Sequence, residues 1–452
     1  MTDTGQTTEP PAQETKLARN VGTVLLFFFI VGDTLGAGIY TLVGTMAEDV
    51  GGMLWLPLVI ALVVALLTAG TYAEMISKYP HAGGAARYAE RAYKKPFLTF
   101  IVGFFMLSSG IVTAALLANA FAGDYFTTLV DVPAAPVTVV FLLVLIGINL
   151  RGVRESLAAN TVATIIETTG LVMVIVVAAI VFGSGGGDPA RILMPSPDQP
   201  ILVGAFAASV VAFFSFLGFE AAANMAEEVK EPSRAYPRAL FGAISTAGVI
   251  YLLIALGSAI VVDPNVMAES TGPLLEVITA SGLPIPGWLF SLIALVAIAN
   301  GALLFMVMAS RATYGLAEVG LLPSIFGNVA PTRRTPWVAI LAVGAATIGM
   351  SFVGNIGTLA DTTVLLLLFV FISTNVSCLV LKKDEVPHEH FRVPTIIPVL
   401  AIIASIVLLT QQSLEIWLLG AAFVVVGTIL FLLARIGRRR FDQGPHETTL
   451  TF

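Results

Sequence analysis

The sequence predicts an all-α integral membrane protein with twelve transmembrane helices, and three observations indicate that fold class. The chain of 452 residues is 57% hydrophobic and only 12% charged, whereas soluble domains average about 25% charged residues. Roughly a dozen apolar runs have about the 18 residues that a helix needs to cross a bilayer. Nearly all Lys and Arg residues fall between alternate runs. We therefore expect a polytopic helical protein, and no basic surface indicates nucleic acid as a partner.

The predicted spans follow one another in the order of the apolar runs. The run at 135–150 is the shortest, and the junction at Gln411 and Gln412 between the last two runs is tight. The twelve ranges are 21–45, 53–78, 97–122, 135–150, 156–182, 201–226, 236–262, 287–317, 337–354, 358–381, 395–411 and 414–434.

The basic residues predict how these spans are oriented. With the N-terminus in the cytoplasm, 22 of the 23 Lys and Arg residues lie on the cytoplasmic side, and only Arg191 lies outside. Membrane insertion retains Lys and Arg in cytoplasmic segments, so a miscounted span would scramble this pattern. We expect a multi-pass protein of the cell membrane with both termini in the cytoplasm.

The first predicted span contains residues that a helix built only to cross lipid avoids. Its middle reads IVGDTLGAGIY, with Asp33 followed by Gly36, Ala37 and Gly38. Glycine costs about 1 kcal/mol in a helix interior, and unwound backbone at membrane depth is tolerated only where it lines a cavity or binds a ligand. We interpret this stretch as a broken helix. Close packing of another helix on Gly36 and Ala37 is the alternative, but it leaves Asp33 unexplained.

The sixth predicted span has a matching interruption. It reads FFSFLGFEAAANMAEE, where Gly218 separates Leu217 from Phe219 and Glu220. The first span runs from inside to outside and the sixth runs the opposite way, so spans one to five and six to ten are interpreted as inverted copies. Paired interruptions in inverted halves are the best sequence indicator of a transporter's central site.

Four motifs resemble those of the amino acid–polyamine–organocation (APC) superfamily of secondary transporters, over roughly residues 15–440. They are GDTLGAGIY, PHAGGAARYAERAY, FSFLGFEAAANMAEEVKEPSRAYPRAL, and SRATYGLAEVGLLP with RRTPWVA following. The resemblance implies alternating access and a five-plus-five inverted-repeat core (APC/LeuT-like) with discontinuous helices 1 and 6. The implied organisation is a disordered cytoplasmic tail at 1–19, a transport core at 20–385, two additional spans at 386–436 and a cytoplasmic tail at 437–452.

The two interruptions predict a site for the head group of an amino acid. Unwinding at 36–38 exposes backbone N–H groups at the start of a half-helix, which suit a carboxylate. Unwinding near Phe214, Ser215 and Leu217 frees carbonyl groups, which suit an ammonium. The resemblance implies the same roles and makes Phe214 an aromatic lid over the substrate. Without the motif, packing would be favoured for Phe214, one of 28 Phe residues.

Three acidic residues, Asp33, Glu167 and Glu220, lie well inside predicted spans, and no Lys or Arg lies at comparable depth. Intramembrane ionisable groups are costly and usually functional. These acids must therefore be protonated or meet a proton, a sodium ion or a substrate ammonium. We assign Asp33 to substrate binding, where it favours a cationic or diamine substrate slightly, and Glu167 and Glu220 to ion coupling.

The resemblance qualifies these assignments. Many bacterial members of the superfamily have a Lys near Glu167, and most have a neutral residue at Asp33, so a Lys-based coupling scheme is in doubt here. For Glu220, hydrogen bonding to the freed backbone of the first span is the alternative. Asn160 and Asn300 either line the path or form packing hydrogen bonds.

Other polar residues are expected to have structural roles. Asp361 near the outer end of the tenth span is expected to be a dipole partner or a cap of that helix, and Glu74 is expected to meet loop cations. In the loop AEEVKEPSRAYPRAL, Arg234 and Arg238 are expected to pair with one of two glutamates, Glu227 or Glu228. His388 and His390 flank one Glu, and a solvated loop is favoured there over a metal site.

The expected function is secondary active import of amino acids or related amines, driven by protons and without a cofactor. A sodium-coupled symporter, for which Ser310 is a candidate ligand, and an exchanger of amino acid for amine remain open. A channel would need a continuous polar path, and an enzyme would need a nucleophile–His or metal constellation, which no span contains. The expected partners are a small amino acid or amine and the lipid bilayer.

Overall fold

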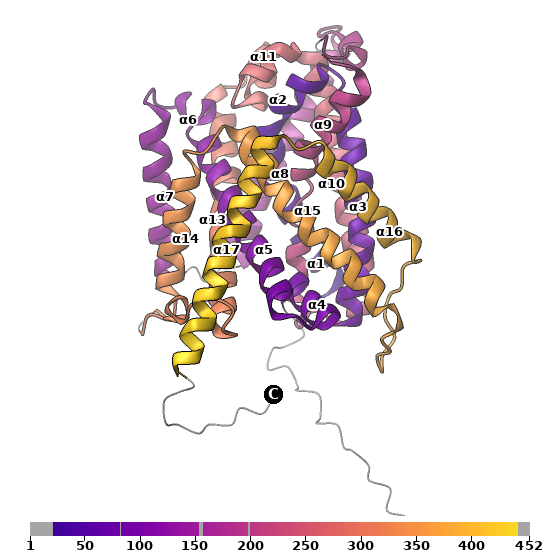
Figure 1. The fold of residues 1–452 in the computed structure, drawn as a ribbon. Coiled ribbons are helices and arrows are strands. Elements are labelled where there is room, and N and C mark those ends of the chain that lie inside the picture. The colour runs from indigo at the N-terminus through magenta and orange to yellow at the C-terminus, as the bar shows by residue number, and fades with distance from the viewer. Residues whose placement is uncertain (1–20, 82, 153–156, 198, 332, 442–452) are drawn as a thin grey trace, which may run out of the picture.

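The computed structural model describes residues 21–81, 83–152, 157–197, 199–331 and 333–441, and the side chains of 157–161 and 437–441 are left undescribed. The predicted tail at 1–19 and most of the tail at 437–452 lie outside the described residues. Every regular element in the described part is a helix (Figure 1).

Nine helices in the described residues are long and apolar enough to cross a membrane, and one bent pair of helices makes a tenth candidate. Each begins and ends within a few residues of a predicted span, except that the first extends to Val50 and the last to Phe441. The bent pair is α1 (Thr23–Thr34) and α2 (Gly38–Val50). The other candidates contain α3 (Trp55–Lys78), α5 (Pro96–Phe121), α7 (Ala134–Arg151), α8 (Leu157–Gly183), α9 (Ile201–Phe214), α10 (Pro232–Val261), α13 (Gly287–Glu318), α15 (Ile356–Val380) and α17 (Leu414–Phe441).

The two remaining predicted spans form shorter helices. α14 (Trp337–Met350) has 14 residues and α16 (Ile396–Thr410) has 15. At 1.5 Å per residue these are about 21 to 23 Å long, whereas the hydrocarbon core of a bilayer is about 30 Å thick. Twelve crossings and the inverted repeat therefore stay predictions.

Short helices and 3-10 turns occupy the connections. They are α4 (Gly84–Tyr93), α6 (Asp124–Thr127), α11 (Pro264–Glu269), α12 (Pro273–Ala280), η1 (Pro189–Leu193), η2 (Phe219–Met225), η3 (Ser324–Gly327) and η4 (Leu381–Lys383).

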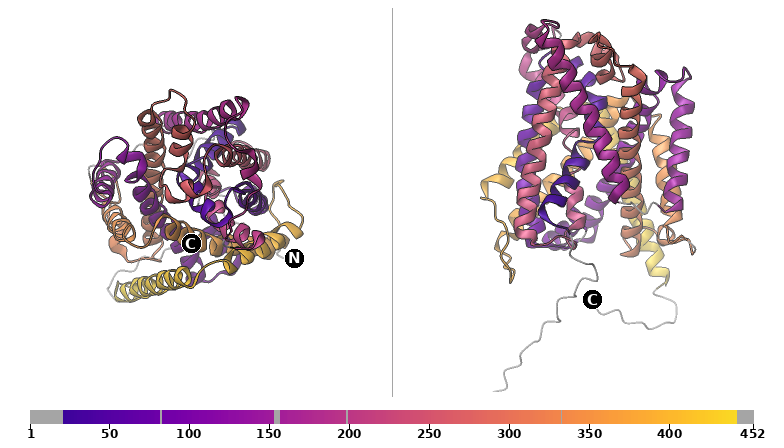
Figure 2. Two further views of the ribbon diagram at one scale, coloured as in Figure 1. Left: turned by 90° about the horizontal axis from the view of Figure 1, so that it is seen from above. Right: turned by 180° about the vertical axis from the view of Figure 1, so that it is seen from behind.

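Within the bent pair, α2 is largely buried among later helices, whereas α1 exposes Val24 and Phe28 on one face (Figure 2). α1 packs against α10 and η2, while α2 packs against α9, α11 and α12. The last helix, α17, runs along the outside of the bundle (Figure 1). In α17, 22% of the most apolar 18-residue stretch is buried. The corresponding share for the span that contains α5 and α6 is 89%. A large exposed apolar face of this kind marks a surface that contacts lipid or another protein.

Candidate functional site

The first span is broken where the sequence predicts. α1 ends at Thr34, α2 begins at Gly38, and the two helices are bent by 45°. Gly38 has a packing reason to lack a side chain, because a Cβ there would lie 3.2 Å from both the Phe214 ring and the Ser215 Cα. The start of α2 therefore lies directly against the end of α9.

The second interruption differs in form from the first. α9 ends at Phe214, as expected, but a turn and the 3-10 segment η2 follow instead of a second α-helix. Gly218 adopts φ +115°, which favours glycine, and a Cβ there would lie 2.8 Å from the Asp33 carbonyl oxygen. The glycine thus allows the second interruption to pack on the backbone of the first.

Tyr251 of α10 joins the two interruptions. Its buried hydroxyl lies 2.5 Å from the Thr34 carbonyl oxygen, at the end of α1, and 2.9 Å from the Ser215 carbonyl oxygen, just after α9. Helix ends leave carbonyls without intrahelical partners, and one hydroxyl proton serves both of these. Sequence reasoning missed this residue, although a tyrosine in the middle of an apolar span was an available signal.

A cavity lies between the two interruptions. The space that the centre of a water molecule can reach inside it has a volume of about 40 Å³. On the same measure, one water molecule needs at least about 10–15 Å³. Its lining residues are Gly32, Asp33, Thr34, Gly36, Ala37, Gly38, Leu117, Glu167, Phe214, Ser215, Leu217, Ala297, Asn300, Gly301, Leu304 and Phe305.

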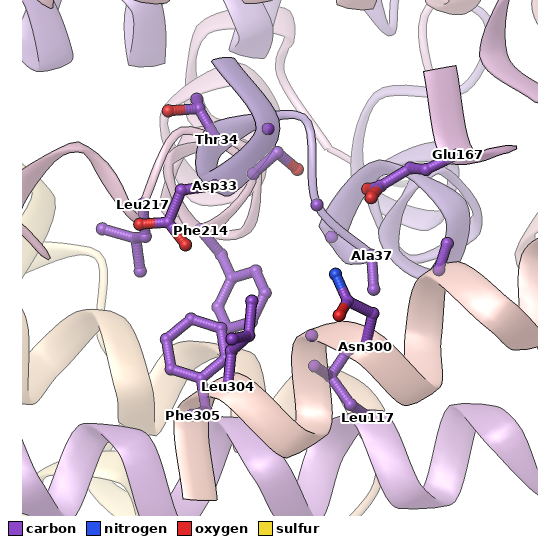
Figure 3. A pocket seen from close by; sticks show the side chains of 16 residues that line it. Asp33, Thr34, Ala37, Leu117, Glu167, Phe214, Leu217, Asn300, Leu304 and Phe305 are labelled. Atoms are coloured by element: carbon purple, nitrogen blue, oxygen red, sulfur yellow. The ribbon is translucent and has the colours of Figure 1, made fainter. Parts of the chain in front are cut away.

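The cavity has a polar part and an apolar part (Figure 3). The side chains of Asp33, Glu167 and Asn300 converge on it from α1, α8 and α13, while the rings of Phe214 and Phe305 are drawn below Asp33 in this view. Small residues form the remaining wall beside the break. Such a mixture of apolar surface and a few convergent polar groups is typical of a small-molecule site.

Several buried polar atoms at this cavity have no hydrogen-bond partner among the described residues. They are Glu167 Oε1, Thr34 Oγ1 and Ser215 Oγ, on side chains that are at most 2% exposed. Buried polar atoms are almost always hydrogen-bonded in native proteins. Three such atoms around one cavity leave hydrogen-bonding capacity for a polar group that enters it.

The structure brings together all but one of the predicted site residues. Glu220 is absent from the cavity lining, although it is buried, and its Oε2 accepts a hydrogen bond of 2.9 Å from the Gly218 N–H. This hydrogen bond therefore joins Glu220 to the backbone at the second interruption and not to the first span. Its role in ion coupling stays a prediction.

The other polar residues that the sequence suggested for the transport path lie in different places in the structure. Asn300 lines the cavity, whereas the Ser310 hydroxyl donates to Val307 and lies 3.3 Å from the Asn149 amide, away from the cavity lining. The Asn160 side chain lies outside the described residues. The lining residues Leu117, Leu304 and Phe305 carry no signal in the sequence, because they are ordinary apolar residues of apolar spans.

The expected cap on α15 is wrong. Asn355, not Asp361, begins this helix, and its Oδ1 accepts a hydrogen bond of 2.8 Å from the Thr358 N–H. Asp361 lies in the second turn, where its Oδ1 is buried without a hydrogen-bond partner among the described residues. Asn355 immediately precedes the first turn, which is where an N-cap residue lies.

A second cluster of charges, which we call the η4 clasp, lies at the C-terminal end of α3, where the chain leads into α4. It comprises Glu74 and Lys78 of α3, Lys382 of η4 and the backbone near Val393. Glu74 Oε2 lies 2.5 Å from Lys382 Nζ and accepts from the Val393 N–H at 2.8 Å. Lys78 donates to the Leu381 carbonyl oxygen at 2.6 Å. The expectation that Glu74 meets a loop cation is confirmed.

Other loop contacts correct the predicted ion pairs. Arg234 lies 3.8 Å from Glu231, and Glu227 faces His81 at 3.7 Å. Partial burial lowers the pKa of His81 from its ordinary value. A left-handed turn at Glu231, with φ +48°, starts α10 and places this acid beside Arg234. This turn cannot be read from the alternating charges of the loop.

The loop after η4 is fastened to the same end of α3. Asp384 accepts hydrogen bonds from the Tyr79 hydroxyl and from Arg91, and these donors lower the pKa of its carboxyl. The His388 ring lies 3.2 Å from the Ser77 carbonyl oxygen. No group of three potential metal ligands occurs in the described part of the chain.

Comparisons with known proteins identify the family of the chain. Residues 21–429 match the family described as "Amino acid permease". Among similar proteins, the "Methylthioribose transporter" of Bacillus subtilis (strain 168) is 26% identical over 454 residues, covering 95% of this chain and 96% of that protein.

Two further relatives carry amino acid names. The "Branched-chain amino acid permease BcaP" of Bacillus subtilis (strain 168) is 25% identical, covering 95% of this chain and 96% of that protein. The "Cationic amino acid transporter 4, vacuolar" of Arabidopsis thaliana is 29% identical, covering 82% and 65%. With the family match spanning nearly the whole described chain, the protein belongs to the amino acid permease family of the APC superfamily.

Proposed function

We propose that this permease is a secondary active transporter that moves amino acids or related amines across the cell membrane by alternating access, coupled to protons. We also propose the twelve-span inverted-repeat architecture with both termini in the cytoplasm. The observation that carries the functional proposal is the cavity between two interrupted spans, where three buried polar atoms lack partners among the described residues.

The backbone at the breaks supports binding of a substrate carboxylate. The first N–H groups of an α-helix have no intrahelical acceptor, and the helix dipole adds positive potential at that end. Gly36, Ala37 and Gly38 at the start of α2 line the cavity with no side chain larger than a methyl group. A carboxylate therefore has access to these N–H groups.

The opposite side of the cavity supports binding of an ammonium group. Asp33 lies in the last turn of α1, and Ser215 and Leu217 follow the end of α9. Helix C-termini carry negative potential, and a carboxylate adds to it. Phe214 lines the cavity beside these groups, which supports its proposed role as a lid.

Buried carboxyl groups support coupling to protons. Glu167 and Glu220 are 1% and 5% exposed, and a charge without a fixed counter-ion is strongly disfavoured at such positions. A proton on either group removes that cost. Sodium coupling has less support, because Ser310 binds Asn149 instead of facing the cavity.

Uptake into liposomes tests this function. Purified protein in proteoliposomes should accumulate a labelled amino acid or amine when the outside is acidified, and protein-free liposomes should not. A panel that includes neutral amino acids, cationic amino acids and their decarboxylated amines covers the proposed range. Uptake that requires sodium and ignores the pH gradient would contradict proton coupling, and no uptake of any member would contradict the substrate class.

A further inference from the structure

We propose that Asp361 is a proton-binding site separate from the central cavity, and that its proton donates a hydrogen bond to Gln412 Oε1 and so fastens α15 to the junction of α16 and α17. We call Asp361 and Gln412 the α15 joint. The inference goes beyond the proposed transport function, because neither residue lines the central cavity. Two buried oxygen atoms without partners among the described residues, on side chains of two neighbouring residues, carry it.

Asp361 and Gln412 are neighbours although they lie in different parts of the chain. Asp361 belongs to the second turn of α15, and Gln412 lies between α16 and α17. Gln412 Nε2 donates to the Asp361 carbonyl oxygen at 3.4 Å. The amide group of Gln412 is therefore held against the turn of α15 that carries the Asp361 carboxyl group.

The α15 joint contains two acceptor atoms that lack a donor. Asp361 Oδ1 and Gln412 Oε1 are both buried, and neither has a hydrogen-bond partner among the described residues. Gln412 as a whole is only 9% exposed. Carboxylate and amide oxygens can only accept hydrogen bonds, and exchanging the two ends of the amide would place Oε1 against the Asp361 carbonyl oxygen. A proton on Asp361 supplies the missing donor, so that one O–H···O bond satisfies both atoms.

The charges around Asp361 favour a bound proton. The charged group that acts on it is Asp49 of α2. Asp49 is itself repelled by Glu48, and it accepts a hydrogen bond of 3.0 Å from Gln199 Nε2, which is a neutral donor. Two neighbouring carboxylates disfavour each other's charge. A proton on Asp361 removes the repulsion between Asp361 and Asp49, while Asp49 keeps its amide donor.

The other elements packed on α15 bring no positive charge to this end of the helix. α5, α9 and α16 contain no titratable residue, and α17 begins with another acid, Glu415, and carries its basic residues at its far end. The titratable residues of α3 and α4 lie toward the η4 clasp, where Glu74 meets Lys382. That is about 30 Å from Asp361 at 1.5 Å per residue. A metal ion has less support than a proton, because no group of three potential metal ligands occurs in the part of the chain that the structure describes.

The α15 joint is coupled to the second half of the broken span. Asp361 is partly exposed, so protons reach it from the solution at this end of the bundle, which the proposed topology places outside the cell. One turn earlier, Gly357 packs on α2, because a Cβ there would lie 3.2 Å from Thr45 Cγ2. With the proton bound, α15 is fastened to the α16–α17 junction, whereas without it the charged Asp361 and Asp49 repel each other. The contact between α15 and α2 therefore depends on pH.

Infrared spectroscopy of the full-length protein in nanodiscs tests whether Asp361 carries a proton. A protonated carboxyl group has a C=O stretching band that a carboxylate lacks, so the wild-type spectrum at pH 5.5 should contain a component that D361N lacks. Q412L removes the acceptor and should shift the frequency of that component. D124N is the matched control, because Asp124 Oδ2 accepts hydrogen bonds from the Thr271 and Gly272 N–H groups at 2.7 and 3.2 Å, and it should leave the component unchanged. Identical spectra of wild type and D361N would overturn the proposal.

Thermal unfolding gives a second readout with a defined sign. In D361N the asparagine amide replaces the proton, because it can donate to Gln412 Oε1 at every pH. We expect wild type and D361N to melt within about 2 °C of each other at pH 5.5, and wild type to fall below D361N as the pH rises to 8.5 and the proton is lost.

Two results of this measurement would overturn the proposal. One is a difference between wild type and D361N that stays the same at both pH values. The other is sodium raising the melting temperature of wild type, but not of D361N, at pH 8.5, because that would assign the site to a metal cation. If D361N does not fold, Q412L decides instead: it should lose more stability relative to wild type at pH 5.5 than at pH 8.5, and an equal loss would contradict the proposal.

Discussion

Two regions of the molecule bury acidic side chains within membrane spans, and they treat the charge in opposite ways. In the η4 clasp, Glu74 Oε2 meets Lys382 Nζ and the Val393 N–H, so its carboxylate has a fixed cation and a backbone donor. In the cavity, Glu167 is equally buried, yet no basic residue lines that space among the described residues. Burial of an acid therefore does not indicate function by itself, whereas burial without a fixed cation does.

The same substitution in both regions gives the largest expected contrast. Glu167→Gln removes the charge without changing the shape, and uptake driven by a pH gradient should fall by about ten-fold or more, equivalent to about 1.4 kcal/mol. The melting temperature should remain within a few degrees of wild type, because no partner in the described residues loses a bond at Oε1. Initial uptake rate and thermal unfolding in detergent measure the two effects. Unchanged uptake over a series of pH values would show that Glu167 is structural.

Glu74→Gln should produce the opposite result. It leaves Lys382 without its anion, and breaking a buried pair costs about 3–5 kcal/mol, less here because the Lys382 side chain is 21% exposed. We expect the melting temperature to fall clearly, while uptake per folded molecule stays within about two-fold of wild type. A loss of uptake at full thermal stability would contradict the division between the two regions.

Tyr251→Phe tests the link between the two helix interruptions. The variant keeps the ring but removes the proton shared by the Thr34 and Ser215 carbonyl oxygens. A lost buried hydrogen bond costs about 1 kcal/mol, so we expect a small drop in melting temperature and a several-fold loss of substrate affinity. Tyr125→Phe, which removes a bond outside the breaks, is the control and should affect stability more than affinity.

Asp384→Asn gives the smallest expected effect. Hydrogen bonds from Tyr79 and Arg91 lower the pKa of this carboxyl, so its contribution to stability exists above the ordinary carboxyl pKa of about 4 and disappears as the pH falls through the lower native value. Exposed pairs contribute at most about 1 kcal/mol. The melting temperatures of variant and wild type should differ slightly at pH 7 and converge in acid. A difference that grows on acidification would contradict this account.

The sequence predicted the first break and most of the cavity because local chemistry dictates them. Glycines and an acid inside an apolar run conflict with a continuous helix, and Asp33, Gly38 and Glu167 therefore stand out. The end of α9 at Phe214 was predicted for the same reason. Its continuation as a 3-10 segment was not, because the geometry depends on Gly218 packing against the Asp33 backbone.

Other parts of the site depend on tertiary packing and carry no local signal. Phe305 and Leu304 line the cavity only because α13 crosses the two interruptions there. Tyr251 acts through backbone carbonyls of two distant segments. The pairing of Arg234 with Glu231 rather than Glu227 follows from the left-handed turn that starts α10. Such contacts are properties of the assembled bundle.

The most direct test of the central claim is a cryo-electron-microscopy structure in nanodiscs with a transported amino acid or amine bound. We expect ligand density between the 35–37 break and the end of α9, with the positive group of the ligand beside Asp33. Density at another place, with this cavity empty under saturating ligand, would show that the cavity is not the substrate site.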